Sequence, residues 1–215
     1  MKDMQVIVFD LDDTLYKEID FVRSGFRAVA QALGHEELLD MMMAVRQAGG
    51  SAFQAAIHSC GSTITPEELV PVYRRHKPAI TLERDAATTL QRLHSSGAVL
   101  GLITDGTGVS QGNKIAALGL QRWMATDHIV ISEVFGHGKP HEACYRHFMD
   151  LHPQARFTYV GDNLSKDFVT ARRLGWDTVC LLDDGRNIFA QDFDAWPPDH
   201  LPDRRIHSLL ELLQS

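Results

Sequence analysis

Cysteine is scarce in this 215-residue chain, which carries only Cys60, Cys144 and Cys180 and has no CxxC pair. Three widely separated cysteines argue against a disulfide framework and a zinc site, so we expect small buried residues in a reducing compartment. No apolar run approaches the roughly 18 residues that cross a bilayer. The N-terminal residues also lack a basic stretch followed by an apolar leader. These absences predict a cytoplasmic protein without a membrane span.

Positive charge is also limited, since 21 basic residues face 28 acidic ones and the formal net charge is −7. No run of Lys or Arg forms a basic stripe, so nucleic acid is not an expected partner. The eleven histidines include no HxH or HExxH spacing, which argues against a histidine metal site. We interpret five of them as helix-surface residues without chemistry: His35, His58, His76, His94 and His207.

Short apolar runs recur along the chain, and each is followed by polar residues and then by a helical pattern. Near-continuous apolar runs are typical of strands that are buried on both faces of a parallel sheet. The runs lie at 5–10, 98–104, 128–132, 157–162 and 178–182. Apolar residues at three- and four-residue spacing predict helices at 83–96, 108–118, 140–151 and 164–174. This alternation predicts an open α/β sheet with right-handed crossovers.

One long segment, residues 18–80, breaks the alternation because its patterns are helical only. The predicted helices lie at 19–33, 36–47, 51–59 and 66–76, with glycines between them. We therefore predict a helical insertion at 18–80 and a core made of 1–17 and 81–215. The C-terminal tail is expected to be irregular until a short helix at 206–213.

Polar side chains gather where the predicted strands end, which in an open α/β sheet is where reactive groups collect. They are Asp10, Asp12, Thr104, Asp162 and Asp167, with Lys139 opening the helix before the fourth strand. The backbone of Asp105 and Gly106 directly follows Thr104. Four carboxylates cannot all stay ionised at close range without a cation, and hard oxygen ligands favour Mg²⁺ beside a phosphate. A Thr hydroxyl, backbone N–H groups and a Lys ammonium are what a phosphoryl group requires. The pattern predicts a phosphoryl-transfer site.

Four short motifs carry a resemblance to a known family. "DLDDT" resembles the first motif of the haloacid dehalogenase superfamily, and "LITDG" resembles its strand that ends in Thr or Ser. "GKP" is similar to its lysine motif and "GDNLSKD" to its terminal acidic motif, so the resemblance spans residues 5–182. The segment from Ile103 to Leu120 and the insertion further resemble the phosphatase branch with a small helical cap after the first motif. The resemblance implies a Rossmann-like parallel sheet with strand order 3-2-1-4-5.

The same resemblance implies roles for the residues at the first strand. Asp10 is the nucleophile that forms an aspartyl phosphate, and it also binds Mg²⁺. Asp12 is the general acid and then the general base, while its backbone carbonyl binds Mg²⁺. Beside so much negative charge, we expect the Asp12 carboxyl to be free to carry a proton near neutral pH. We interpret Asp13 as a solvated loop residue.

Roles follow from the resemblance for the remaining site residues too. Thr104 and the N–H groups of Asp105 and Gly106 hold the phosphoryl oxygens, while the Asp105 side chain is interpreted as solvated. Lys139 neutralises charge on the nucleophile and on the transferring phosphoryl group. Two further carboxylates complete the set, because Asp162 is a direct Mg²⁺ ligand and Asp167 orients a metal-bound water or Lys139.

The expected activity is a Mg²⁺-dependent phosphomonoesterase acting on a small phosphorylated metabolite, either a sugar phosphate or a nucleoside monophosphate. Asp12 argues against dehalogenation, since hydrolytic dehalogenases lack that second acidic residue. A phosphomutase shares all four motifs and stays open. A phosphoaspartate receiver and a catalytically silent binding module are the alternatives from other classes. Arg23, Arg27 and Arg46 are candidates for a second substrate group or are simply the polar faces of cap helices, and the protein is expected to be a monomer or homodimer.

Overall fold

A parallel sheet with strand order β3-β2-β1-β4-β5-β6 lies at the centre of the computed structural model, which describes residues 4–214. The strands are β1 Gln5–Phe9, β2 Val99–Thr104, β3 Ile129–Ile131, β4 Arg156–Gly161, β5 Asp177–Leu181 and β6 Arg204–Ile206. The expected order 3-2-1-4-5 is confirmed, with β6 added beside β5. The strand that ends at Asp10 therefore lies in the interior of the sheet, between β2 and β4.

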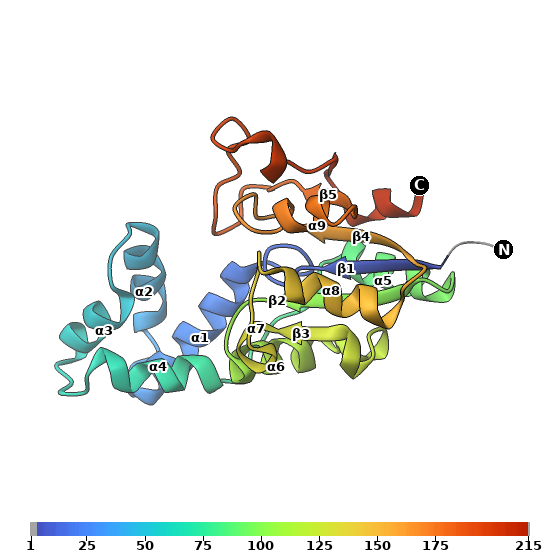
Figure 1. The fold of residues 1–215 in the computed structure, drawn as a ribbon. Helices are drawn as coiled ribbons and strands as arrows, with labels where there is room; N and C mark the ends of the chain where they lie inside the picture. The colour runs from blue at the N-terminus through green and yellow to red at the C-terminus, as the bar shows by residue number, and fades with distance from the viewer. Residues whose placement is uncertain (1–3, 215) are drawn as a thin grey trace.

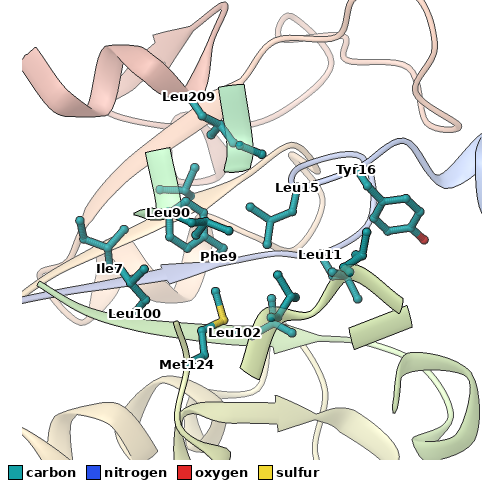
Figure 2. Packing of buried hydrophobic residues seen from close by; sticks show 14 of the residues in the cluster. Ile7, Phe9, Leu11, Leu15, Tyr16, Leu90, Leu100, Leu102, Met124 and Leu209 are labelled. Atoms are coloured by element: carbon teal, nitrogen blue, oxygen red, sulfur yellow. The ribbon is translucent and has the colours of Figure 1, made fainter. Parts of the chain in front are cut away.

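Helices cover both faces of this sheet, as Figure 1 shows. Side chains alternate along β1, so Ile7 and Phe9 pack against α5 and α6, and Val6 and Val8 pack against α8 and α9. Figure 2 shows Phe9 beside Leu90 on the first of these faces. Core helices are α5 Arg84–Ser95, α6 Gly108–Leu118, α7 Ser132–Phe135, α8 Glu142–Leu151 and α9 Val169–Arg173. Apolar side chains on both sheet faces hold three layers together.

Residues 18–75 form a group of helices to one side of the sheet, with α2 to α4 on the side away from both termini (Figure 1). They are α1 Glu18–Ala32, α2 Leu38–Gln47, α3 Ala52–Cys60 and α4 Pro66–Arg75. Their apolar faces meet in a cluster of their own, which includes Phe26, Met42 and Leu69. Each of these helices lies where the apolar periodicity predicts one. The predicted division into core and insertion reaches residues 1 and 215, which lie outside the described range.

Two predicted helices are wrong in extent. Only Val169–Arg173 of the predicted helix 164–174 is helical, because 163–167 form a turn around the Asp167 carboxylate. At the C-terminus, Arg204–Ile206 pairs with β5, so the predicted helix at 206–213 begins later, as a 3₁₀ helix over Leu209–Gln214. A local turn replaces the start of the first predicted helix, and a long-range strand pairing replaces the start of the second.

Cys144 and Cys180 are buried, as predicted, and Cys60 is partly buried. The interpretation of His76 as a surface residue is wrong. Its ring lies against Phe21 in a tilted arrangement, with centroids 4.9 Å apart, and its Nε2 lies 3.1 Å from the Ser24 hydroxyl. Within residues 4–214, none of the helices is both long and apolar enough to cross a membrane.

Candidate active site

Asp10, Lys139 and Asp167 form a buried chain of ion pairs at the carboxyl edge of the sheet. Lys139 Nζ lies 2.6 Å from Asp10 Oδ1 and 2.7 Å from Asp167 Oδ1, and the lysine side chain has no exposed surface. Asp10 directly follows β1, and its N–H donates to Val160 O of β4 at 2.8 Å. The two ion pairs join residues that are 129 and 28 positions apart, so the fold brings together residues that the strand ends predicted to be close.

The end of β4 wraps around the Asp167 carboxylate. Asp167 Oδ2 accepts the N–H groups of Asp162 at 3.1 Å and of Asn163 at 2.9 Å. A Cβ at Gly161 would lie 2.3 Å from the same oxygen, so the close approach requires glycine there. Asp167 thus shapes the turn that carries Asp162 and also contacts Lys139.

Carboxylates outnumber cations in this cluster. Oxygens of Asp10, Asp162 and Asp167 lie within 4.8 Å of one another, and all three residues are buried. Burial raises the pKa of Asp10 to about 7 although Lys139 opposes the shift, and burial together with Asp167 raises the pKa of Asp162 well above its ordinary value. Burial acts to lower the pKa of Lys139, but the carboxylates of Asp10 and Asp167 raise it well above its ordinary value, so its ammonium stays charged. A set of buried oxygen donors with an uncompensated negative charge fits a hard divalent cation such as Mg²⁺.

Three side chains donate to the Asp12 carboxylate. Lys114 Nζ lies 2.7 Å from Oδ1, the Tyr16 hydroxyl donates to the same oxygen, and Gln111 Nε2 donates to Oδ2 at 3.0 Å. Burial acts to raise the pKa of Asp12, but the Lys114 ammonium and these hydrogen bonds bring it below its ordinary value. The expectation of a carboxyl free to carry a proton near neutral pH is therefore wrong for this arrangement, because Lys114 stabilises the ionised form.

Thr104 and Gly106 lie at the end of β2, where the phosphoryl group is expected. The Thr104 hydroxyl is buried and accepts a hydrogen bond from Gln111 Nε2. The Gly106 N–H donates to Ser132 Oγ at 2.9 Å, so in this structure it is already bonded within the protein. A phosphoryl oxygen has to replace that bond in order to use the Gly106 N–H.

The Asp105 side chain is not the solvated group that the sequence suggested. Its Oδ1 accepts the Lys139 N–H at 2.9 Å, and its Oδ2 lies 2.7 Å from Lys166 Nζ. Burial acts to raise the pKa of Asp105, but the ammonium groups of Lys139 and Lys166 lower it. Asp105 therefore joins the loop after β2 to the segment that carries Lys139.

The interpretation of Asp13 as a solvated loop residue is also wrong, because the residue is buried, with 2% of its surface exposed. One carboxylate oxygen accepts the N–H of Glu18 at the start of α1, and the other accepts the N–H of Ile188, each at 2.8 Å. Asp13 itself has a φ of 56°, a left-handed conformation that Asp tolerates better than most residues. It ties the first loop to α1 and to the loop after β5, and contacts 175 residues away cannot be seen from a local pattern.

The loop after β5 supplies a site residue that sequence reasoning missed. Asn187 Nδ2 donates to Asp162 Oδ2 at 3.1 Å, and Asn187 Oδ1 accepts from Lys17 Nζ at 2.7 Å. Lys17 is buried and also lies 3.1 Å from Asp184 of the same loop. Asn187 therefore fixes the orientation of the Asp162 carboxylate.

Gln111 and Lys114 were missed as well, although the sequence carried a signal. They lie on the face of the predicted helix 108–118 that also presents Ile115 and Leu118 to the core. Two long polar side chains on an apolar helix face need buried partners, which here are Asp12 and Thr104.

A cavity of about 120 Å³ opens onto the carboxylates. Asp10, Asp12 and Asp162 line it together with Glu18, Lys166 and Phe189. The candidate arginines are elsewhere, since Arg46 lines a separate cavity within the helical group and Arg23 and Arg27 are exposed. The cavity is therefore acidic, with one ammonium group from Lys166 at its edge.

Comparison with known proteins gives a matching family model and named relatives. A model described as haloacid dehalogenase-like hydrolase matches residues 7–181. The chain is 30% identical to a glyceraldehyde 3-phosphate phosphatase of Methanocaldococcus jannaschii, over 96% of this chain and 94% of that protein. It is 31% identical to a protein of the same name from Methanopyrus kandleri, over 98% of this chain and 96% of that protein.

The fold is also found among solved structures. YfnB of Bacillus subtilis, described as an HAD hydrolase bound to magnesium, superposes with a TM-score of 0.72. Its sequence is 19% identical, and the match covers 99% of this chain and 98% of that one. This likeness concerns the fold.

Proposed function

The chain belongs to the haloacid dehalogenase-like hydrolase family, and we propose that it is a phosphomonoesterase with Asp10 as its nucleophile. One observation carries the proposal: the buried ion pair of Asp10 with Lys139, at the carboxyl edge of the sheet beside Asp162. A carboxylate attacking phosphorus needs a nearby fixed cation, and Lys139 supplies one at 2.6 Å. A monomeric or homodimeric state and a cytoplasmic location stay predictions from the sequence.

In the first half-reaction, an Asp10 carboxylate oxygen bonds to phosphorus as the bond to the ester oxygen breaks. Asp12 then gives a proton to that leaving oxygen, so the alcohol departs neutral. Lys114 disfavours the protonated form that this step requires, and the negative charge of a bound phosphate ester beside Asp12 acts in the opposite sense. Lys139 offsets the negative charge that is shared between Asp10 and the phosphoryl oxygens, and Thr104 with the N–H groups after it binds those oxygens. Asp10 is then an aspartyl phosphate.

In the second half-reaction, Asp12 takes a proton from water, which attacks the phosphorus of the aspartyl phosphate. The bond to Asp10 breaks, so inorganic phosphate leaves and the Asp10 carboxylate is restored. The base needs to be ionised, which is the form that Lys114 favours. Asp10, Asp162 and the Asp12 carbonyl would hold Mg²⁺, which would supply positive charge beside the phosphoryl group.

The proposed substrate is a small sugar phosphate. Two relatives that match nearly the whole chain are named glyceraldehyde 3-phosphate phosphatases, which favours a triose phosphate over a nucleoside monophosphate. The helical segment 18–80 is proposed as the cap that covers the leaving group. Glu18 at its start is the cap residue that reaches the cavity.

Phosphate release from a panel of phosphate esters tests the proposal. D-Glyceraldehyde 3-phosphate and other sugar phosphates are compared with nucleoside monophosphates, with Mg²⁺ and with EDTA. We expect Mg²⁺-dependent release from the sugar phosphates and none from an Asp10→Asn variant, which keeps the shape of the side chain. Absence of release across the panel, or equal release by Asp10→Asn, contradicts the proposal. Conversion of a sugar phosphate into an isomer without free phosphate identifies a mutase instead.

A further inference from the structure

Lys114 is an unusual residue in the core because its charged end is buried. It lies on α6, is 3% exposed, and places its ammonium group 2.7 Å from Asp12 Oδ1. The Phe21 ring of α1 lies against the same group, with its centroid 4.2 Å from Nζ. Burial of an ammonium group is costly unless a partner compensates, and Asp12 is that partner. The residue therefore has a specific electrostatic task and is not one more solvated lysine.

Three side chains from two segments fix both oxygens of Asp12. We call Tyr16, Gln111 and Lys114 the Asp12 clamp: the first two donate from a hydroxyl and an amide, and the third from an ammonium group. Gln111 also donates to Thr104, so the clamp connects the acid–base carboxylate to the expected phosphoryl site. None of the three clamp atoms is among the groups that contact Asp10 or Asp162.

We propose that Lys114, with Tyr16 and Gln111, is a positioning residue that holds the Asp12 carboxyl where it exchanges protons with the leaving oxygen and with water. The inference rests on the proposed function, because it assigns the clamp to the acid–base group of that reaction. Lys114 transfers no proton and bonds to no substrate atom; it acts through Asp12. Without the ammonium group, the carboxyl loses its strongest donor and populates other rotamers.

The two half-reactions respond differently to a misplaced Asp12. A sugar alkoxide is a poor leaving group and needs the proton, whereas p-nitrophenolate leaves without one. The ratio kcat/KM reports the first, irreversible bond cleavage, so it depends on Asp12 for a sugar phosphate and much less for p-nitrophenyl phosphate. Water attack on the aspartyl phosphate needs Asp12 with either substrate, so kcat falls for both and the phosphoenzyme accumulates.

The test compares Lys114→Met with the wild type and with Lys77→Met, which makes the same substitution at an exposed lysine of the helical segment. For Lys114→Met we expect kcat/KM for D-glyceraldehyde 3-phosphate to fall about tenfold or more, and that for p-nitrophenyl phosphate to stay within about threefold. Acid-quenched Lys114→Met should gain about 80 Da, the mass of a phosphoryl group, on the intact protein. Lys77→Met should match the wild type on both substrates.

Tyr16→Phe is the second variant, since it removes a donor to the same Asp12 oxygen without changing the shape of the ring. It should lower kcat/KM for D-glyceraldehyde 3-phosphate more than kcat/KM for p-nitrophenyl phosphate, as Lys114→Met does. If thermal unfolding shows that Lys114→Met is not folded, Tyr16→Phe alone tests the inference. Equal losses on both substrates with no phosphoenzyme overturn the inference, because they indicate a structural role only. Wild-type kinetics in Lys114→Met overturn it too. A wild-type enzyme inactive on both substrates refutes the proposed function itself.

Discussion

Asp10 makes the stability of the metal-free protein dependent on pH in an unusual direction. Burial raises the pKa of Asp10 from 3.8 to about 7, so between these values the folded protein keeps a proton that the unfolded chain has lost. The free energy of unfolding therefore decreases as the pH rises through this window. Ordinary paired carboxylates, whose pKa values are lowered on folding, give the opposite slope.

The size of the effect follows from the shift. A rise of about three units in the pKa of Asp10 corresponds to about 4 kcal/mol in the free energy of unfolding. About 3 kcal/mol of this stabilisation is lost between pH 5 and pH 8. The Asp10→Asn side chain does not ionise, so the free energy of unfolding of this variant should not show this decrease. Mg²⁺ favours the ionised carboxylate, so the ion should stabilise the wild type more strongly at pH 8 than at pH 5.

Urea unfolding of both proteins in EDTA, at half-unit steps from pH 5 to pH 8, measures this difference. Taking the wild type minus Asp10→Asn removes the contributions of titrating groups that do not interact with Asp10, such as His76, whose pKa is lowered by burial. We expect the difference to fall by about 3 kcal/mol across the range and the fall to shrink in saturating Mg²⁺. A difference that is constant with pH in EDTA refutes the reasoning, because Asp10 is then ionised throughout.

Three further predictions concern the metal, Lys139 and Asp13. EDTA should abolish phosphate release and Mg²⁺ should restore it, with Ca²⁺ much poorer because it takes more ligands at longer distances; full activity in EDTA contradicts the metal assignment. Lys139→Met leaves Asp10 and Asp167 without their shared ammonium group, so steady-state assays should show kcat lowered on the order of 100-fold. A loss of less than about threefold would show that the role given to Lys139 is wrong. Asp13→Ala leaves the N–H groups of Glu18 and Ile188 without an acceptor, so urea unfolding should show a loss of about 2–4 kcal/mol; an unchanged midpoint with an unchanged slope argues against this anchoring role.

Local patterns in the sequence determined the elements and the edge of the sheet where the chemistry is proposed. Near-continuous apolar runs marked β1, β2 and β4, because a strand buried on both faces has no polar side to show. Polar residues directly after those runs are brought to one edge in any parallel sheet, so Asp10, Thr104 and Asp162 could be grouped without coordinates. The resemblance to a known family supplied the strand order and the role expected of each residue.

The tertiary structure alone decided which groups surround each carboxylate. Asp12 is held ionised by Lys114, 102 positions away, and Asp13 is buried by a loop 175 positions away. A pKa and the burial of a side chain depend on every charge and dipole packed within a few ångströms, and sequence spacing does not state those distances. The edge strand β6 has the same cause, since three residues become a strand only because β5 offers its free edge. The sequence thus placed the carboxylates at one edge of the sheet. Packing determined that Asp13 is buried and anchors two loops, that Asp12 is bound by Lys114, and that Asp10 shares the Lys139 ammonium with Asp167.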